Sequence, residues 1–197
     1  MNYSIYAEST PNPEVMKFVA NRMLADKSIE IKTLKDAKGI SIAEELLKFP
    51  FIKSIYLSSN FISVSKIETV KWEDIAMQLR TFIVDHLNSN EIKNYTQNIQ
   101  KSVPNSTKNY NEQDVINKQF TDEELNIIQV LEKYIAPAIE ADGGAITLNY
   151  YKDNIVCVDL KGACSGCPSS TSTLKGGIEN LLKEKINPNI EVISNEK

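Results

Sequence analysis

A strand pattern changes to a helix pattern around two cysteines that lie three positions apart, Cys164 and Cys167. The stretch before them, residues 155–160, is a short run rich in β-branched residues, which favours a strand. After them, apolar residues recur at helical spacing, at Leu174, Ile178, Leu181 and Leu182. Both thiols are therefore expected at a strand-to-helix junction, where a helix begins.

This junction is suited to bind a soft metal, but it supplies only half of a ligand set. Pro168 fits the first helical turn, where its missing N–H costs nothing. The positive end of the helix dipole favours thiolate over thiol, and Gly162 and Gly166 let a bulky inorganic ligand approach the backbone. Iron–sulfur clusters and structural zinc each require four ligands, whereas Cys164 and Cys167 provide two. The simplest completion is a second copy of the chain.

Two other residues are candidates for the missing ligands. Cys157 lies inside the predicted strand, and we interpret it as a small buried hydrophobic residue. His86 is the only histidine and lies near the end of a helix that the sequence assigns to another domain. We interpret it as a surface or capping residue, so neither side chain is expected to complete the site.

The segment from 127 to 193 resembles the C-terminal domain of the NifU-like (Nfu-type) iron–sulfur cluster scaffold and carrier proteins. The matching segments are Pro137-Ala138, Glu140-Ala141-Asp142-Gly143-Gly144, Gly162–Ser170, Thr173-Leu174-Lys175 and Gly177-Ile178-Glu179. The resemblance implies that Cys164 and Cys167 bind a 4Fe-4S cluster, or a 2Fe-2S cluster, between the two protomers of a homodimer. It also implies a carrier rather than an enzyme, with apo iron–sulfur client proteins and upstream cluster-assembly proteins as partners.

Two other protein classes use a cysteine pair of this kind. A thioredoxin-like oxidoreductase also places its cysteines at a helix N-terminus, but a βαβ unit precedes the motif in that class. Here a predicted hairpin precedes the motif, and Ser165 and Gly166 separate the cysteines. A structural zinc dimer would use the same four thiolates. We prefer the cluster carrier. Colour would separate it from the other two classes, because a cluster protein purified without air is brown whereas the zinc and disulfide forms are colourless.

The composition is ordinary for a soluble globular protein, with 42% hydrophobic and 24% charged residues among 197. A formal net charge of −4 argues against a nucleic-acid partner, and no apolar run approaches the length of a membrane span. The first residues read as a strand and not as a signal or transit peptide. Three cysteines, two of them in a ligand-type pair, favour a reducing environment, so we expect a cytoplasmic protein.

The chain is expected to be an α+β protein with two small α/β-sandwich domains joined by a flexible polar linker. Residues 1–88 resemble the Nfu N-terminal domain through Thr10–Pro13 with Lys17-Phe18, the block 51–65 and Trp72. Residues 89–121 are rich in Asn, Gln, Ser and Lys, which is typical of a linker, with a helical extension over 91–99. Residues 122–197 form the cluster-binding domain, with the order α-β-β-α-β.

Within residues 1–88 the pattern predicts strands, a hairpin and two helices. The strands cover 3–8, 15–20 and 28–32, and the hairpin joins 52–57 to 61–65. Ser41 with Glu44 reads as a capping box at the start of a helix that ends near Pro50, and a second helix covers 71–87. The bend Thr10–Pro13 is either a plain turn or part of a docking face for client or partner proteins.

Within residues 122–197 the pattern predicts a helix, a hairpin, a second helix and a last strand. Thr121 with Glu124 forms a capping box, and the helix continues to a break at Asp142-Gly143-Gly144, where Asp142 is expected to cap the helix end. The hairpin joins 145–151 to 155–160 around residues 152–154, and the last strand covers 190–193.

Overall fold

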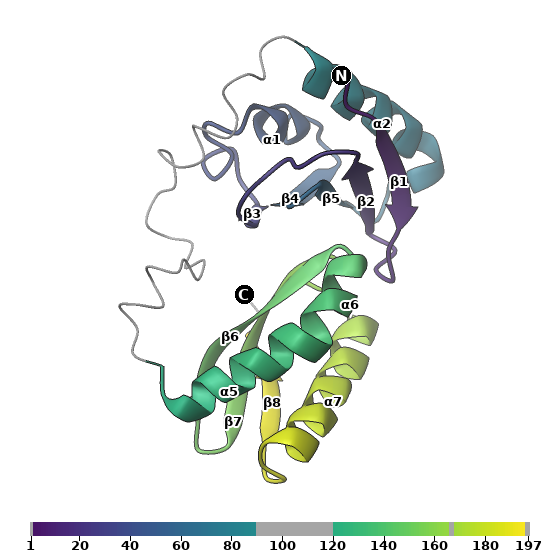
Figure 1. Cartoon of the computed structure of the whole chain (residues 1–197). Helices are drawn as coiled ribbons and strands as arrows, with labels where there is room; N and C mark the ends of the chain where they lie inside the picture. Colours follow the sequence, from purple (N-terminus) through teal and green to yellow (C-terminus); the bar gives the residue numbers. More distant parts are fainter. Residues whose placement is uncertain (1, 90–119, 166–167, 196–197) are drawn as a thin grey trace. The chain divides into compact units, whose positions relative to one another are not determined.

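The computed structural model describes residues 2–89, 120–165 and 168–195, without the side chains of 168–172. The chain divides into two compact units, residues 1–109 and 110–197, and each is described here by itself (Figure 1). Both units combine helices with a sheet, which confirms the predicted α+β class. The predicted helical extension over 91–99 lies outside the described residues, and the domain boundaries at 88 and 122 remain predictions.

Within its described residues, 2–89, the first unit is a five-stranded antiparallel sheet with two helices. Its strands lie in the order β1-β2-β5-β4-β3. The elements are β1 (Ile5–Ser9), β2 (Val15–Ala20), β3 (Ile29–Ile31), α1 (Ser41–Leu46), β4 (Ile52–Ser58), β5 (Phe61–Lys66) and α2 (Trp72–Asn88). The predicted strands, the β4–β5 hairpin and the helix over 71–87 are therefore confirmed.

The core of this unit lies between the helices and one face of the sheet. Alternate residues of a strand share a face, and Phe18 in β2 pairs with Ile62 in β5 on the face that enters the core. Helix α2 contributes a stripe with a spacing of four residues, formed by Ile75, Leu79, Ile83 and Leu87. The apolar side of the amphipathic helix α2 is therefore the side that packs against the sheet.

The capping box that the sequence predicts at Ser41 is wrong. The N-cap of α1 is Ile40, which makes no side-chain cap, and Ser41 is already helical. The Ser41 hydroxyl lies 3.1 Å from His86 Nε2 in α2, while Glu44 Oε1 accepts from the Gly39 N–H at 2.9 Å. The Ser41 hydroxyl thus contacts a side chain of another helix and does not cap the backbone N–H groups at the start of α1. The helix also ends at Leu46, before the expected end near Pro50.

The second unit has the predicted order α-β-β-α-β. Its elements are α5 (Asp122–Val130), the π-helical segment η2 (Leu131–Ile135), α6 (Ala136–Ala141), β6 (Gly144–Lys152), β7 (Ile155–Gly162), α7 (Pro168–Lys185) and β8 (Glu191–Ser194). The strands lie in the order β6-β7-β8, with β6 antiparallel and β8 parallel to β7. The core is formed by Ile127 and Leu131 from the first helix, Val156 and Val158 from β7, and Ile178 and Leu182 from α7.

The first helix of this unit begins as predicted but changes its winding before it ends. Thr121 Oγ1 accepts from the Glu124 N–H at 3.2 Å and Glu124 Oε2 accepts from the Thr121 N–H at 3.0 Å, which confirms the capping box. The five-residue π segment η2 was not predicted. Pro137 has no N–H to donate to the carbonyl of Lys133 and its ring crowds that carbonyl, so the helix widens ahead of the proline.

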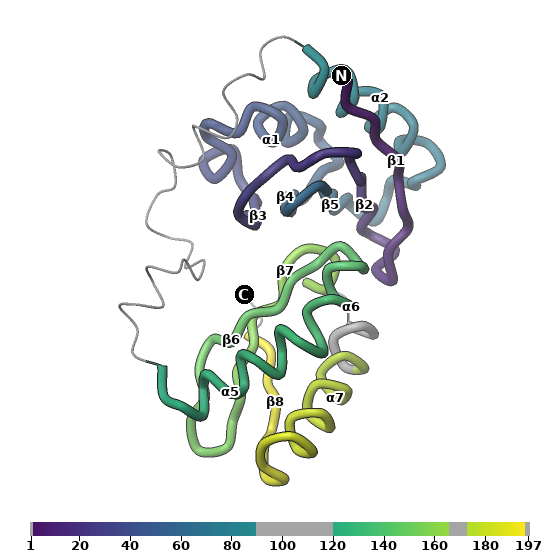
Figure 2. The backbone as a smooth tube through the Cα atoms, in the orientation of Figure 1, coloured from purple at the N-terminus to yellow at the C-terminus, as the bar shows by residue number. Residues whose placement is uncertain are grey.

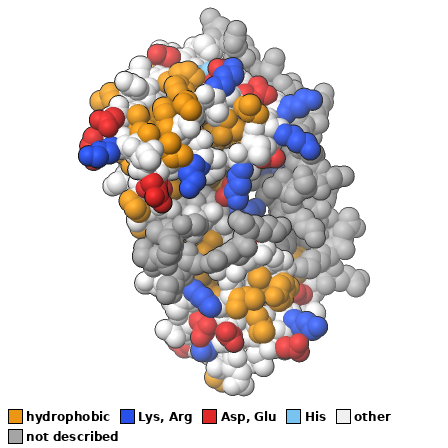
Figure 3. All heavy atoms as spheres, turned by 180° about the vertical axis from the view of Figure 1, so that it is seen from behind, with side chains coloured by type: hydrophobic (Ala, Val, Ile, Leu, Met, Phe, Trp, Pro, Cys, Tyr) orange, Lys and Arg blue, Asp and Glu red, His pale blue; other side chains and the backbone are white. Residues whose placement is uncertain are grey.

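The described surface carries a mixture of side-chain types. On the face shown in Figure 3, acidic and basic side chains are interspersed and border the hydrophobic ones. None of the helices in the described parts of the chain has both the length and the apolar character required to cross a membrane.

Candidate cluster-binding site

Cys164 lies in the loop that joins β7 to α7. The strand ends at Gly162 and the helix begins at Pro168, so the predicted strand-to-helix junction is confirmed. Cys164 is 7% exposed. Cys167, the second expected ligand, lies outside the described residues. The structure therefore shows how one of the two proposed ligands is held.

Backbone hydrogen bonds hold the residues on both sides of Cys164, Ala163 and Ser165. Gly162 has φ 64°, a left-handed conformation that favours glycine, and its carbonyl accepts from the Ser165 N–H at 3.1 Å. The Ala163 N–H donates to the Gly143 carbonyl at 3.2 Å. The loop thus lies beside the chain that follows α6, and the two segments can be followed in Figure 2.

The Asp142-Gly143-Gly144 segment ends α6 and begins β6. The Asp142 N–H donates to Ala138 O at 3.1 Å and the Gly143 N–H donates to Glu140 O at 3.0 Å. Asp142 is the C-cap, and Gly143 follows with φ 82°, which confirms the predicted cap and turn. The sequence pattern predicts this segment and the cysteine motif as separate features, and it gives no sign that the two segments are in contact.

Cys157 is buried in β7, as predicted, and is 4% exposed. Its neighbours Val156 and Val158 enter the core, so its thiol lies on the opposite face of the sheet, beside its cross-strand partner Tyr150. Burial raises the pKa of the Cys157 thiol most strongly, the charge of Asp159 raises this pKa further, and a hydrogen bond with Tyr150 partly offsets the rise. A thiol with a raised pKa stays protonated at neutral pH, which makes it a poor metal ligand.

His86 lies in the last turn of α2, in the first unit. Its ring stacks on Phe82 with the ring centroids 6.1 Å apart, and its Nε2 contacts the Ser41 hydroxyl. The described ranges 2–89, 120–165 and 168–195 contain no group of three or more His, Cys, Asp or Glu side chains placed to hold a metal ion.

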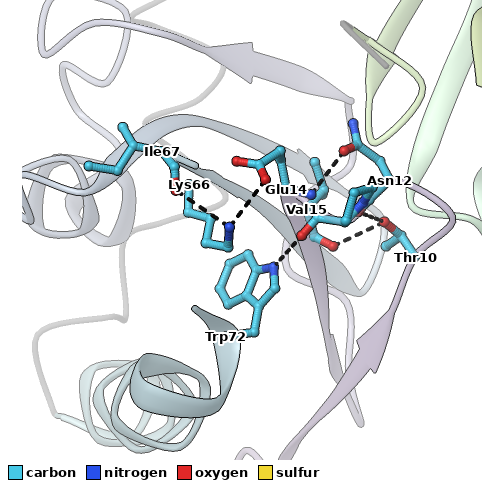
Figure 4. Close-up of polar contacts among 8 residues, drawn as sticks. Thr10, Asn12, Glu14, Val15, Lys66, Ile67 and Trp72 are labelled. Atoms are coloured by element: carbon cyan, nitrogen blue, oxygen red, sulfur yellow. Dashed lines mark hydrogen bonds and ion pairs between the residues drawn. The ribbon is translucent and has the colours of Figure 1, made fainter. Parts of the chain in front are cut away.

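The bend Thr10–Pro13 is fixed by hydrogen bonds within the first unit (Figure 4). The Thr10 hydroxyl lies 2.9 Å from Asn12 O and 3.0 Å from Val15 O, and Asn12 Oδ1 accepts from the Glu14 N–H at 3.0 Å. Asn12 is itself buried. These polar side chains of the motif therefore hold the bend in shape, as the plain-turn interpretation requires.

A second set of contacts ties the bend to β5 and α2. The Trp72 indole N–H donates to Pro13 O at 3.0 Å, and Lys66 Nζ lies 3.3 Å from Glu14 Oε1 and 5.7 Å from the centre of the Trp72 ring. Figure 4 shows the indole and the ammonium group at the start of α2. The lysine side chain is almost completely buried, where an unpaired charge would be costly. The glutamate and the aromatic ring compensate this charge.

Replacement of Trp72 by phenylalanine is expected to destabilise the first unit by about 0.5–1.5 kcal/mol, because it keeps an aromatic ring and removes the hydrogen bond to Pro13. Urea unfolding followed by a probe in the first unit would measure this change. The same substitution should leave the unfolding of residues 122–197 unchanged. An unaltered midpoint for the first unit would show that the indole N–H does not stabilise the bend.

Comparison with known proteins gives a match for each of the two units. Residues 5–90 match the family model described as "Scaffold protein Nfu/NifU N terminal". Residues 127–193 match the model described as "NifU-like domain". The two matches together cover most of the chain, including the bend at Thr10–Pro13, the Asp142–Gly144 segment and both cysteines of the pair.

Several curated proteins are similar to this chain along almost all of its length. The NFU1 iron-sulfur cluster scaffold homolog, mitochondrial, of Drosophila ananassae is 30% identical over 195 residues, which are 98% of this chain and 64% of that protein. The human protein of the same name is 28% identical, with 95% of this chain and 69% of that protein covered. The NifU-like protein 4, mitochondrial, of Arabidopsis thaliana is 28% identical, with 90% and 61% covered.

This chain thus spans a little under two thirds of the length of the fly and plant relatives. The prediction of a cytoplasmic location is wrong, since these relatives are named as mitochondrial proteins. That prediction depended on the three cysteines, two of them in a ligand-type pair, and on the strand pattern of the first residues. Free thiols indicate a reducing environment without telling one reducing compartment from another, and a strand within a folded domain says nothing about compartment.

Proposed function

The chain belongs to the NifU-like proteins of the Nfu type, and on this basis we propose that it is a scaffold and carrier of iron–sulfur clusters. The cluster is its cargo, received from upstream assembly proteins and transferred to apo-proteins. The structural observation that best supports this proposal is the loop of Cys164, which is fixed by Gly143 on one side and leads into the N-terminus of α7 on the other.

The proposed ligands are Cys164 and Cys167. A helix of 18 residues begins at Pro168, directly after the second cysteine, and the partial positive charge of its N-terminus favours thiolates and an anionic cluster. Cys157 is an unsuitable ligand because its thiol is buried on the other side of β7 with a raised pKa. One protomer therefore offers two thiolates.

The proposed cargo is a 4Fe-4S cluster, or a 2Fe-2S cluster, shared by two protomers. Both cluster types take four protein ligands, so two copies of the pair complete the set. A site built from two chains opens when the chains separate, which suits release of the cluster to a client. In this proposal the protein transfers a finished cluster and does not act as an enzyme.

The first unit is proposed to dock client proteins. It has a separate core and contributes none of the proposed ligands, so its role would be to bring the cluster close to an apo-protein. The bend Thr10–Pro13 is held by contacts within the unit, which makes it a rigid feature that a partner could bind. The proposed division of labour separates holding the cluster from finding its recipient.

A shortened chain of residues 117–197 should hold a cluster as well as the full chain but transfer it more slowly, by roughly an order of magnitude if docking raises the local concentration of client. The measurement is the rate at which an apo 4Fe-4S dehydratase gains activity, with both proteins at equal cluster concentration. Equal rates for several clients would remove the docking role. Loss of cluster binding by the shortened chain would instead show that residues 1–116 support the site.

A further inference from the structure

Gly144, at the start of β6, has no room for a side chain. A β-carbon at this position would lie 2.7 Å from Lys161 O, 2.9 Å from Cys164 Sγ and 3.2 Å from Cys164 N. The first two distances are shorter than the contacts that a carbon atom makes with a non-bonded oxygen or sulfur atom in a well-packed protein. The thiol of Cys164 therefore occupies the space that any side chain at position 144 would require.

The backbone conformation does not explain the glycine at this position. Gly143 and Gly162 adopt left-handed conformations with φ 82° and 64°, whereas Gly144 does not have a positive φ. The φ of Gly144 therefore lies outside the left-handed region that favours glycine. What excludes a larger residue is contact with the end of β7 and with the cysteine that follows it.

The surroundings leave little freedom to absorb an added methyl group. Gly144 pairs with Gly162 across the hairpin, and the next contact outward is the hydrogen bond from the Ala163 N–H to Gly143 O. Further along the hairpin, the paired residues Leu148 and Val158 are buried in the core and fix the strands. Lys161 O belongs to the backbone of β7, whereas the Cys164 side chain can turn about its χ1 angle, so an added methyl group would displace the Cys164 thiol more readily than the strand.

We propose that Gly144 is a positioning residue for Cys164, and that its missing side chain sets where the Cys164 thiol lies. The consequence for cluster binding rests on the proposed carrier function, because a displaced thiolate is a poorer ligand for a shared cluster. The contact itself exists without a cluster. It can therefore be tested on the protein before any metal is added.

The chain offers a matched control for this test. A β-carbon at Gly177, in the middle of α7, would meet nothing within 4 Å, and the same holds for Gly176. Gly177→Ala makes the same chemical change in the same unit as Gly144→Ala, without a steric conflict. Alanine is also the better helix former, so this control should fold at least as well as the wild type.

The first experiment measures the reactivity of Cys164 in the full chain free of metal, with Cys157→Ser and Cys167→Ser present so that Cys164 is the only cysteine. Iodoacetamide is the probe. Gly144→Ala should raise the alkylation rate of Cys164 by about tenfold or more, because the buried thiol is pushed out, while Gly177→Ala leaves it unchanged. An unchanged rate in a folded Gly144→Ala protein would overturn the proposal.

The second experiment is a double-mutant cycle on stability, in a background that keeps the other cysteines. Gly144→Ala should lower the urea midpoint of unfolding, and this shift should be clearly smaller in Cys164→Ala, where the sulfur is absent. Equal shifts in both backgrounds would contradict the proposal and assign the conflict to the backbone atoms Lys161 O and Cys164 N. If Gly144→Ala does not fold, folding of the double variant would support the proposal, and failure of both to fold would contradict it.

Cluster retention gives the third readout and separates this inference from the proposed function. If the wild type and Gly177→Ala retain iron after reconstitution, Gly144→Ala should retain several-fold less. Equal retention by all three would overturn the positioning role while leaving the carrier function intact. If the wild type retains no iron, the carrier function fails, and the alkylation rate and the double-mutant cycle still decide the role of Gly144.

Discussion

Replacement of Cys164 by serine is expected to reduce the iron bound after anaerobic reconstitution to less than about a tenth of the wild-type amount, because the site would keep one thiolate per protomer where a cluster needs four in all. Cys167→Ser should have the same effect. A serine hydroxyl remains protonated and binds iron weakly, whereas its size is close to that of the thiol. The loss should therefore occur without a loss of fold.

Cys157→Ser is the matched control, since it makes the same substitution on the neighbouring strand. Val156 and Val158 lie on the face of β7 that enters the core, and Cys157 lies on the opposite face. Its raised pKa keeps the thiol protonated. Iron content in this variant should be close to that of the wild type. Full iron content in Cys164→Ser, or complete loss in Cys157→Ser, would mean that the ligands are assigned wrongly.

Loading with a cluster is expected to convert a monomer into a dimer. Each chain brings two proposed ligands, so the binding energy of the cluster becomes available only when two chains meet, and ligand binding then shifts the equilibrium towards the dimer. Light scattering on protein without metal, at low micromolar concentration, should give the mass of one chain. After loading, the mass should double, and removal of the cluster should restore the monomer.

The variants provide the control for this second prediction. Cys164→Ser should remain a monomer under the same loading conditions, because it lacks the cluster that joins the chains. A dimer of equal strength in the absence of metal would show that other surfaces hold the chains together. A monomer that carries a complete cluster would show that ligands come from elsewhere, such as a small thiol in solution.

The sequence predicted those features of the site that depend on local pattern. The change from β-branched residues to helical spacing placed Cys164 at a junction, and the structure has β7 ending at Gly162 and α7 beginning at Pro168. The hairpin around residues 152–154 was likewise predicted, and in the structure β6 and β7 are joined there by Asp153 and Asn154, two residue types that tolerate their positive φ. These features are decided by neighbours in the chain, so a single sequence carries enough information.

The contact between Gly144 and Cys164 could not be predicted in the same way. Regular antiparallel pairing from Lys152 and Ile155 would place Gly144 opposite Ala163, whereas a bulge near Asn149 shifts the register and places it opposite Gly162. No residue type in β6 predicts that bulge. A shift of one residue moves side chains to the other face of a sheet, so the sequence could not show which residue meets the thiol.

The two capping boxes show the same limit within the helices. Thr121 with Glu124 and Ser41 with Glu44 have equivalent local patterns, but only the first forms a capping box. The Ser41 hydroxyl instead contacts His86, which is 45 positions away in the sequence. A tertiary partner at that distance can outcompete a cap that is worth about 1 kcal/mol, and local pattern gives no sign of it.

Measurement of iron, acid-labile sulfide and zinc per protomer in the reconstituted full chain tests the carrier proposal most directly. If two protomers share one 4Fe-4S cluster, the protein should hold about two iron and two sulfide ions per protomer, or about half of each for a 2Fe-2S cluster, with little zinc. The protein should be brown. A colourless protein that holds zinc without sulfide, or that binds neither metal, would contradict the proposal that this chain carries iron–sulfur clusters.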